Sequence, residues 1–367
     1  PDTGDGGGLS APAGVVATSG SANYKLYVSD SARHIIQVIA AGTAATFAGS
    51  PGAPGLADGA GDAARFNRPR GLSINRAGAL IVADAGNDRL RSITAGGVVA
   101  TTGTTGADAD LAAAAGLASV DGAGGETYIA DTGNHLIKKI TASGEVRIVA
   151  GSAMPGTANG PLLEAQFNSP AGVAVDATGG YLYVADTGNH AIRLIDLDGG
   201  EVSTFAGQPG IAGEADGGAG DATFRSPGDL AVDGDGEVYV ADTGNSRIRL
   251  ITADGARTVS TLAGGAPGFV DGAGTAARFN SPSALAFADD GSLYVADTGN
   301  HAIRRIAPDD AATVTTLALQ SPASPASPGQ TPGDSGKGGG GGAPMPWLAA
   351  ALAVLFIARR MARTTAP

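Results

Sequence analysis

The stretch YVADTGNHAIRLI, residues 183–195, decides the fold because it recurs along the chain. Close copies are YVADTGNHAIRRI at 294–306, YVADTGNSRIRLI at 239–251 and YIADTGNHLIKKI at 128–140, and weaker ones are IVADAGNDRLRSI at 81–93 and YVSDSARHIIQVI at 27–39. The aligned aspartates are Asp30, Asp84, Asp131, Asp186, Asp242 and Asp297, with separations of 54, 47, 55, 56 and 55 residues. A period of about fifty residues indicates one supersecondary unit per repeat, stacked on its neighbours to share a core. The chain therefore holds six units.

One period, residues 167–207, displays the elements of a unit. The runs AGVAV, YLYVAD, AIRLI and EVSTFAG are rich in β-branched and aromatic residues, and the turn formers DATGG, TGN and DLDGG separate them. We expect four antiparallel strands per unit, named A to D in chain order. Six such units predict an all-β fold, a six-bladed β-propeller in which strand A of each blade lines a central channel. A β-sandwich would use only about seven to nine strands in all.

The motif YVADTGNHxIR, preceded by FNxPxGLAV, resembles the NHL repeat, a family that builds six-bladed propellers. The resemblance covers residues 9–318. Blade one departs from it with Ser-Ala-Arg-His in place of Thr-Gly-Asn-His, and blade three reads LAAAAGLASV where the others have Phe-Asn-x-Pro. Blade one starts within residues 11–18 and blade six ends within 313–318. We therefore expect the ring to close by face-to-face packing of these two blades, with no strand exchanged between the termini.

The Asp-Thr-Gly-Asn motif after strand B is interpreted as a tight turn. The glycine supplies the positive φ of the turn, and the aspartate accepts from main-chain N–H groups two residues further on. The residues assigned to this structural turn are Asp84, Asp131, Asp186, Asp242 and Asp297, with Gly133, Gly188, Gly244 and Gly299. The four histidines, His34, His135, His190 and His301, share one repeat position. Radial symmetry keeps them apart, whereas zinc needs three or four ligands around one point, so we predict no catalytic residue, no metal site and no cofactor.

Two other repeated features belong to the loops that join strand D to the next strand A. The phenylalanines at the end of these loops are expected to cap the blades: Phe66, Phe167, Phe224 and Phe279. The aspartates Asp58, Asp216 and Asp271 are interpreted as Asp-Gly turns. Calcium needs six to eight oxygens around one point, and one carboxylate per blade does not provide them.

Composition narrows the classes of function. Hydrophobic residues make up 43% of the 367, and 60 glycines with only 16% charged residues are typical of a turn-rich β protein. The absence of cysteine excludes disulfides, thiolate nucleophiles and cysteine–zinc sites. The net charge is −12, and because the tail after residue 318 contributes +3, the propeller carries −15. Such a surface, without a segregated basic patch, would repel nucleic acid, and we predict no nucleic-acid partner.

The region after the last repeat has its own organisation. Residues 319–342 form a Pro/Ser/Gly-rich stretch with no capacity for a core, predicted to be a disordered linker. Residues 343–358 lack charge and precede Arg359 and Arg360, which predicts a short apolar helix within a transmembrane sorting signal or anchor over 343–367. The spacer, glycine run, apolar helix and arginine pair resemble the GlyGly-CTERM signal of bacterial surface proteins. That resemblance implies cleavage near the glycines by a rhomboid-type intramembrane protease, and a plain membrane anchor is the alternative.

The other end of the chain also suggests export. Residues 1–8 are predicted to be flexible, and the chain begins at Pro1 without a methionine, as after removal of an export signal. Together with the tail, this predicts an exported protein at the bacterial cell surface or outside the cell, anchored in the membrane only transiently.

Ligand recognition is expected on the face that carries the loops from strand D to the next strand A. Three of these loops are long, at residues 49–69, 207–228 and 264–282, and loops of this length on a rigid ring commonly carry recognition. The candidate ligand-binding residues near the start of strand A are Arg70, Arg225, Asp229 and Ser283. Arg70 and Asp229 break the repeat in blades two and five, which face each other in a six-bladed ring. Opposed charges at the channel mouth would orient a small polar or saccharide ligand.

Three classes of function remain open. The first is an exported, surface-displayed binding or adhesion scaffold for an extracellular glycan, peptide or protein. The second is a structural subunit that self-associates into a surface layer or filament. The third is a lyase or lactonase, which the resemblance implies because related propellers include such enzymes. Those sites draw metal-binding side chains toward the channel, and no histidine here lies off the repeat.

Overall fold

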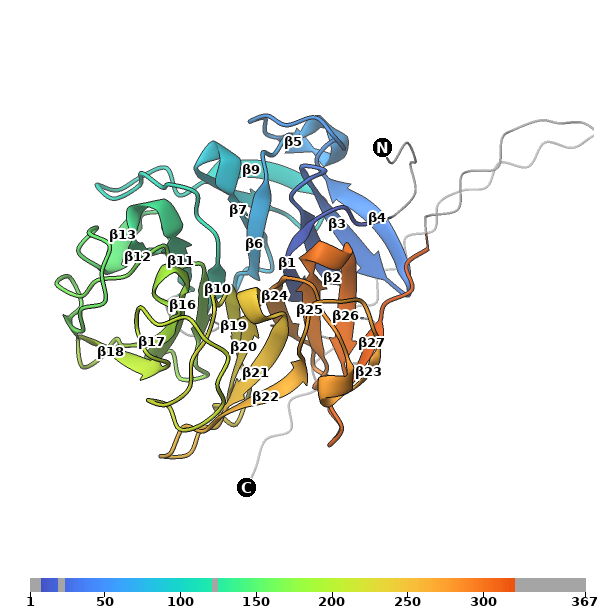
Figure 1. The fold of residues 1–367 in the computed structure, drawn as a ribbon. Helices are drawn as coiled ribbons and strands as arrows, with labels where there is room; N and C mark the ends of the chain where they lie inside the picture. The colour runs from blue at the N-terminus through green and yellow to red at the C-terminus, as the bar shows by residue number, and fades with distance from the viewer. Residues whose placement is uncertain (1–7, 19–23, 121–124, 321–367) are drawn as a thin grey trace, which may run out of the picture. The chain divides into compact units, whose positions relative to one another are not determined.

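The computed structural model describes residues 8–18, 24–120 and 125–320, and these residues fold into six antiparallel sheets arranged as a ring (Figure 1). The predicted six-bladed all-β propeller is therefore confirmed. The predicted linker, the apolar helix over 343–367 and the GlyGly-CTERM-like signal lie outside the described residues, apart from the first two linker residues. In the part that is described, no helix is long and apolar enough to cross a membrane.

Each blade takes its strands A to D from one contiguous segment, as the sequence predicts. Blade one comprises β1 (Pro12–Ala17), β2 (Leu26–Asp30), β3 (Ile35–Ala40) and β4 (Thr43–Ala48). Blade two comprises β6 (Pro69–Ile74), β7 (Leu80–Asp84), β8 (Arg89–Ile93) and β9 (Val98–Thr102). Blade three comprises β10 (Leu117–Ser119), β11 (Thr127–Asp131), β12 (Leu136–Ile140) and β13 (Val146–Ala150). Blade four comprises β15 (Gly172–Val175), β16 (Tyr181–Asp186), β17 (Ala191–Asp196) and β18 (Glu201–Ala206). Blade five comprises β19 (Asp229–Val232), β20 (Val238–Asp242), β21 (Arg247–Ile251) and β22 (Val259–Gly264). Blade six comprises β24 (Pro282–Phe287), β25 (Leu293–Asp297), β26 (Ala302–Ile306) and β27 (Thr313–Thr316).

Three blades have a fifth strand that the sequence does not predict. The short strands β5 (Gly59–Ala60), β14 (Gly160–Pro161) and β23 (Gly272–Ala273) pair antiparallel with the outer strands β9, β18 and β27. Each comes from the loop that enters the blade, and it covers part of an outer edge that would otherwise expose unpaired main-chain groups. Two residues are too few to produce an alternating pattern, which explains why the sequence does not reveal these strands.

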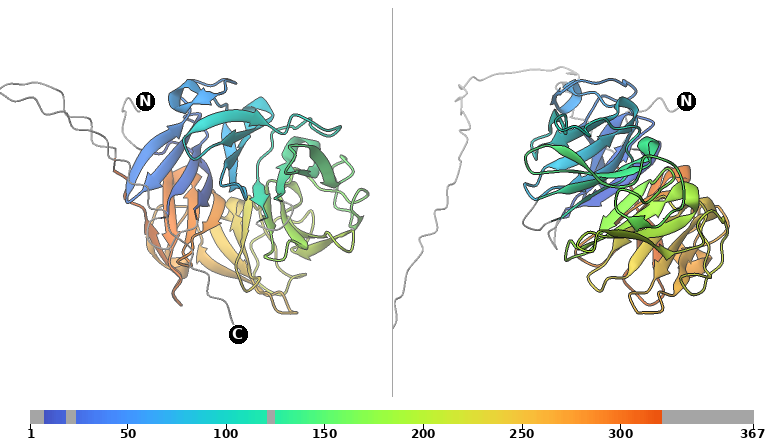
Figure 2. Two further views of the ribbon diagram at one scale, coloured as in Figure 1. Left: turned by 180° about the vertical axis from the view of Figure 1, so that it is seen from behind. Right: turned by 90° about the vertical axis from the view of Figure 1, so that its left-hand side faces the viewer.

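The inner strands form a closed ring around the channel. Successive inner strands lie against each other in the order β1, β6, β10, β15, β19 and β24, and β24 lies against β1. Figure 2 shows the same ring from behind and from the side. Strand A is the shared wall of the channel, so residues near its start surround the channel mouth.

Blades one and six close the ring without exchanging a strand, as predicted. Residues from both blades share one apolar cluster that includes Val28 and Tyr294. The Thr298 hydroxyl donates to the Pro12 carbonyl over 2.5 Å, as Thr187 donates to Pro227 between blades four and five. One contact goes beyond the prediction, because Gln320 forms a parallel bridge with Thr43 at the edge of blade one.

Each seam between neighbouring blades is filled by apolar residues from both. The four phenylalanines expected to cap the blades are fully buried, with 0% exposure. Phe224, for example, packs in a cluster with Ile192 of blade four and Val240 of blade five. Burying a phenylalanine contributes about 2–3 kcal/mol, so the repeated phenylalanine is explained by stability.

Candidate functional site

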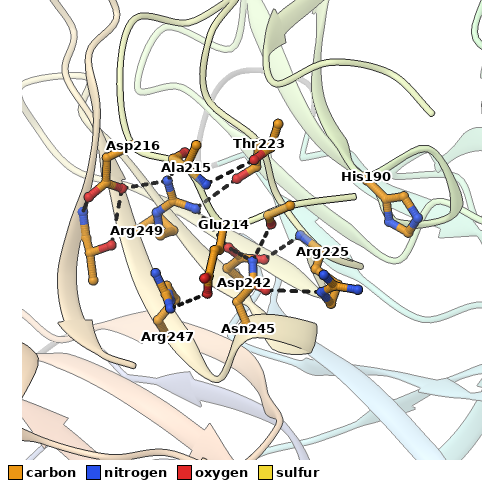
Figure 3. A network of polar contacts seen from close by, with 12 residues as sticks. His190, Glu214, Ala215, Asp216, Thr223, Arg225, Asp242, Asn245, Arg247 and Arg249 are labelled. Atoms are coloured by element: carbon orange, nitrogen blue, oxygen red, sulfur yellow. Dashed lines mark hydrogen bonds and ion pairs between the residues drawn. The ribbon is translucent and has the colours of Figure 1, made fainter. Parts of the chain in front are cut away.

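The repeated aspartate joins three parts of the chain, as blade five illustrates (Figure 3). Asp242 ends β20 with 0% exposure. Its Oδ1 accepts from the Arg225 main-chain N–H over 2.8 Å, and its Oδ2 accepts from Asn245 over 2.8 Å and Arg249 over 2.9 Å. Burial raises the pKa of Asp242, and these hydrogen bonds oppose that shift.

The arginine that pairs with this aspartate is also fully buried, and it fixes the incoming loop. Arg249 donates to the carbonyls of Thr223 and Ala215 and to Asp216 Oδ1, the last over 2.6 Å. Its guanidinium lies 5.1 Å from the centroid of the Phe224 ring. Equivalent arginines in the other regular blades are Arg91, Arg193 and Arg304. Among the described residues, the Nε atoms of these arginines have no hydrogen-bond partner, but the side chains are fully buried, so the cluster offers little to a ligand.

The Asp-Gly turns of the loops are part of this network, which the sequence interpretation missed. Asp58 and Asp271 pair with Arg91 and Arg304 as Asp216 pairs with Arg249. The pattern weakens in the irregular blades. Blade three has Lys138 bound to Asp131, and blade one has a buried Gln37 in place of the cation.

The structure corrects the explanation of the Asp-Thr-Gly-Asn turn. The motif forms a single 3₁₀ turn, such as Thr187–Asn189 after Asp186. The positive φ of 58° belongs to His190, not to Gly188. Gly188 is needed for space, because a Cβ there would lie 2.6 Å from the Asn168 carbonyl oxygen. The aspartate also bonds a distant loop and a buried arginine, not the N–H two residues further on.

The histidines join neighbouring blades. The Nδ1 atoms of His34, His135 and His190 accept from the main-chain N–H groups of Arg68, Ser169 and Ser226 in the next blade. An imidazole used in this way is a structural acceptor. Across the described ranges of the chain, no group of three or more His, Asp or Glu side chains could hold a metal ion.

A cavity of about 440 Å³ lies at the channel mouth. Its wall combines small residues from the starts of the inner strands with hydroxyls from the turns. The polar residues in the wall are Ser31, Arg68, Arg70, Thr187, Ser226, Asp229, Thr243, Ser283 and Thr298. Arg70, Asp229 and Ser283 therefore line one cavity, and their role in ligand binding stays a prediction. Arg68 was missed, although it too breaks the repeat, with arginine where blades four and six have serine.

Asp229 is half-buried, whereas Arg68 and Arg70 are exposed. It stands where blades one to four have glycine and blade six has alanine, and its Oδ2 accepts from the Leu285 main-chain N–H of blade six over 2.9 Å. Its Oδ1 lies beside Gly172 of blade four, 2.8 Å from where a Cβ would be. Burial raises the pKa of this carboxyl to about 7, while the N–H groups of Leu285 and Leu230 act against the shift.

Two of the predicted residues have contacts that bear on their role. Arg225 is not in the cavity wall. It is exposed and donates from Nε to Asn245 Oδ1 over 3.2 Å, and its side chain packs on Gly244 (Figure 3). Ser283 remains in the wall, where its hydroxyl lies 2.5 Å from that of Thr298. The structure therefore separates Arg225 from the group at the mouth.

The fold is a six-bladed β-propeller whose regular blades share one buried aspartate–arginine network. The family described as the Teneurin NHL domain matches residues 119–252, and the NHL repeat matches residues 279–306. The chain therefore contains NHL repeats, folded as a six-bladed propeller.

Relatives of known name share these repeats within much longer chains. Protein SUPPRESSOR OF QUENCHING 1, chloroplastic, of Arabidopsis thaliana is 29% identical over 280 residues, covering 70% of this chain and 26% of that protein. NHL repeat-containing protein 2 of Bos taurus is 34% identical over 193 residues, covering 49% of this chain and 26% of that protein. The chain thus spans about a quarter of the length of these relatives.

A solved structure supports the fold. An auxiliary nutrient binding protein of Bacteroides thetaiotaomicron superposes with a TM-score of 0.61 at 16% identity, covering 84% of this chain and 70% of that chain. At this level of identity, the likeness concerns the fold.

Proposed function

We propose that this protein is an exported, surface-displayed binding scaffold that holds a small polar ligand at its channel mouth. The observation that carries the proposal is that Arg70 and Asp229, of opposite charge, line one cavity. The repeat does not require either residue, whereas its own polar groups are used within the fold. The volume of about 440 Å³ lies within the range common for ligand pockets.

Two further observations support binding on this face. Two of the structurally similar Bacteroides proteins are named auxiliary nutrient binding proteins. The loops from strand D to the next strand A also carry exposed apolar side chains, namely Leu56, Met154, Ile211 and Phe269. Exposed apolar side chains on these loops favour contact with a peptide or a protein surface.

Display at the cell surface rests on the tail sequence. The glycine run and the short apolar stretch before Arg359 favour processing by a rhomboid-type protease, with the propeller on the exported side. Mature protein should then lack Trp347 to Pro367. Intact-mass measurement of protein taken from its native cell tests this, and a mass that includes Trp347 would leave only the plain anchor.

The binding proposal is tested with glycan and peptide arrays probed by the full chain. Ala171→Trp should fill the mouth, and the strand should tolerate it because the aligned position in blade two already carries Arg70. Ala77→Trp, on an exposed turn between strands A and B, is the matched control. We expect Ala171→Trp alone to lose binding. Equal binding by both variants would place the ligand elsewhere, and concentration-dependent assembly without any array binding would favour the structural subunit.

A further inference from the structure

Two arginines at the channel mouth carry charge that no neighbouring group neutralises. Arg68 and Arg70 are exposed and line the cavity. Neither guanidinium has a hydrogen-bond or ion-pair partner among residues 8–18, 24–120 and 125–320. Other surface arginines, such as Arg65 and Arg89, donate to main-chain carbonyls. Arg68 directly precedes β6 and Arg70 lies within it, and both line the same cavity. Two unpaired guanidiniums in one cavity wall are available to an incoming carboxylate, which they can bind through several N–H groups.

The main chain that carries these arginines is fixed to blade one. The Arg68 N–H donates to His34 Nδ1 over 3.0 Å. The Pro69 and Arg70 carbonyls accept from the hydroxyls of Ser31 and Ser29 over 2.5 and 2.6 Å. With the main chain held in place, less entropy is lost when the side chains order around a ligand.

An acidic group faces this pair from the far side of the ring. Asp229 belongs to blade five, opposite blade two, and lines the same cavity. Its Oδ2 receives the Leu285 N–H, and no cationic side chain binds its carboxylate among the described residues. Arg68, Arg70 and Asp229 are the charged residues of the cavity wall. The mouth is therefore positive on one side and acidic on the other.

The remaining wall suits a peptide better than a sugar. Among the described residues that line it, no side chain is aromatic, whereas the apolar face of a sugar ring commonly packs on an aromatic ring. Thr187 and Thr243 each donate their hydroxyl proton to a proline carbonyl. Their oxygens therefore keep a lone pair that can accept a peptide N–H.

Building on the proposed function, we infer that the mouth selects a short peptide with free ends. Its terminal carboxylate binds Arg68 and Arg70, and its terminal ammonium binds Asp229. The charge arrangement complements a zwitterion, and it disfavours a ligand with negative charge at both ends, because the second carboxylate would meet Asp229.

Isothermal titration of the full chain at pH 7.5 tests this with tri-alanine as the probe. The C-terminal amide of tri-alanine lacks the negative carboxylate, and N-acetyl-tri-alanine lacks the positive ammonium group. Charge-assisted hydrogen bonds predict that either modification lowers affinity about tenfold or more. The Arg68→Ala/Arg70→Ala variant should bind tri-alanine and its C-terminal amide with equal affinity. The Asp229→Asn variant should likewise bind tri-alanine and its N-acetyl form with equal affinity. Arg89→Ala, an exposed arginine outside the cavity, should bind like the unchanged protein.

The outcomes separate this inference from the proposed function. Equal binding of tri-alanine and its doubly blocked form overturns the selection for free ends, and so does a lack of binding at millimolar concentration. If Ala171→Trp still abolishes capture of another array ligand, such as a neutral glycan, the binding function stands and only the peptide inference fails. If the mouth variant affects no ligand, both fail.

Discussion

Asp229→Asn should stabilise the protein, and by more at higher pH. In the folded chain the pKa of this carboxyl is raised from 3.8 to about 7, mainly by burial. Folding therefore favours the protonated form, and ionisation destabilises the fold as pH rises from the unfolded pKa through about 7. Each pKa unit corresponds to about 1.4 kcal/mol, which gives an upper limit of about 4 kcal/mol at pH 8. Asparagine carries no charge and keeps an oxygen that can accept from Leu285.

Urea unfolding of both proteins at pH 4 and pH 8 measures this effect. The stability gained by Asp229→Asn should grow between the two pH values by about 2–4 kcal/mol. Comparing the variant with the unchanged protein cancels the titration of the other buried aspartates. Asp254→Asn, at an exposed position where hydrogen bonds lower the pKa, is the control and should show no such gain. A gain from Asp229→Asn that is equal at both pH values, or larger at pH 4, would refute the raised pKa of this carboxyl in the folded chain.

Three further predictions concern single residues within the repeats. Arg249→Met leaves Asp242 buried without its cation and should cost about 3–5 kcal/mol, whereas exposed Arg147→Met should cost about 1 kcal/mol or less; equal losses in urea unfolding would contradict the buried network. Gly188→Ala should destabilise through the 2.6 Å approach of its Cβ to the Asn168 carbonyl, so a thermal melt unchanged from the parent would show that the turn does not need this space. At Gly200 φ is +74° and an added Cβ would have no atom within 4 Å outside its chain neighbours. Gly200→Ala should therefore lower the free energy of unfolding by about 1 kcal/mol through backbone strain alone.

The sequence predicts the architecture well because the same turn residues and strand pattern recur from one unit to the next. Six copies of the motif in register determine the number of blades and the contiguous strands. The two-residue strands such as β14 leave no comparable pattern, because their pairing comes from the path of a loop over an edge in three dimensions.

The chemistry of the motif was harder to predict. Asp186 next to Thr-Gly-Asn suggests a local turn, but its partners Asn168 and Arg193 lie in other elements. A signal for the buried ion pair was present, because Arg193 shares one face of β17 with Ala191 and Ile195, and both are apolar. An arginine in an apolar strand is usually read as solvent-facing, so the pairing becomes visible only when the incoming loop is in place.

The candidate site could be predicted in part from the sequence. Arg70 and Asp229 were selected because they break the repeat, and the structure places both in the wall of one cavity. Arg225 also breaks the repeat, yet its side chain packs on Gly244 outside the cavity wall. Departure from a repeat identifies residues that the fold does not demand, but the direction of a side chain depends on contacts that the sequence does not specify.

A crystal structure of the protein with its strongest array ligand would show directly whether the ligand binds at the channel mouth. We expect ligand density in the channel-mouth cavity, in contact with Arg70 on one side and Asp229 on the other, with the repeated aspartate–arginine pairs unchanged. Ligand bound at a blade edge or on the opposite face, with the mouth holding only water, would contradict it.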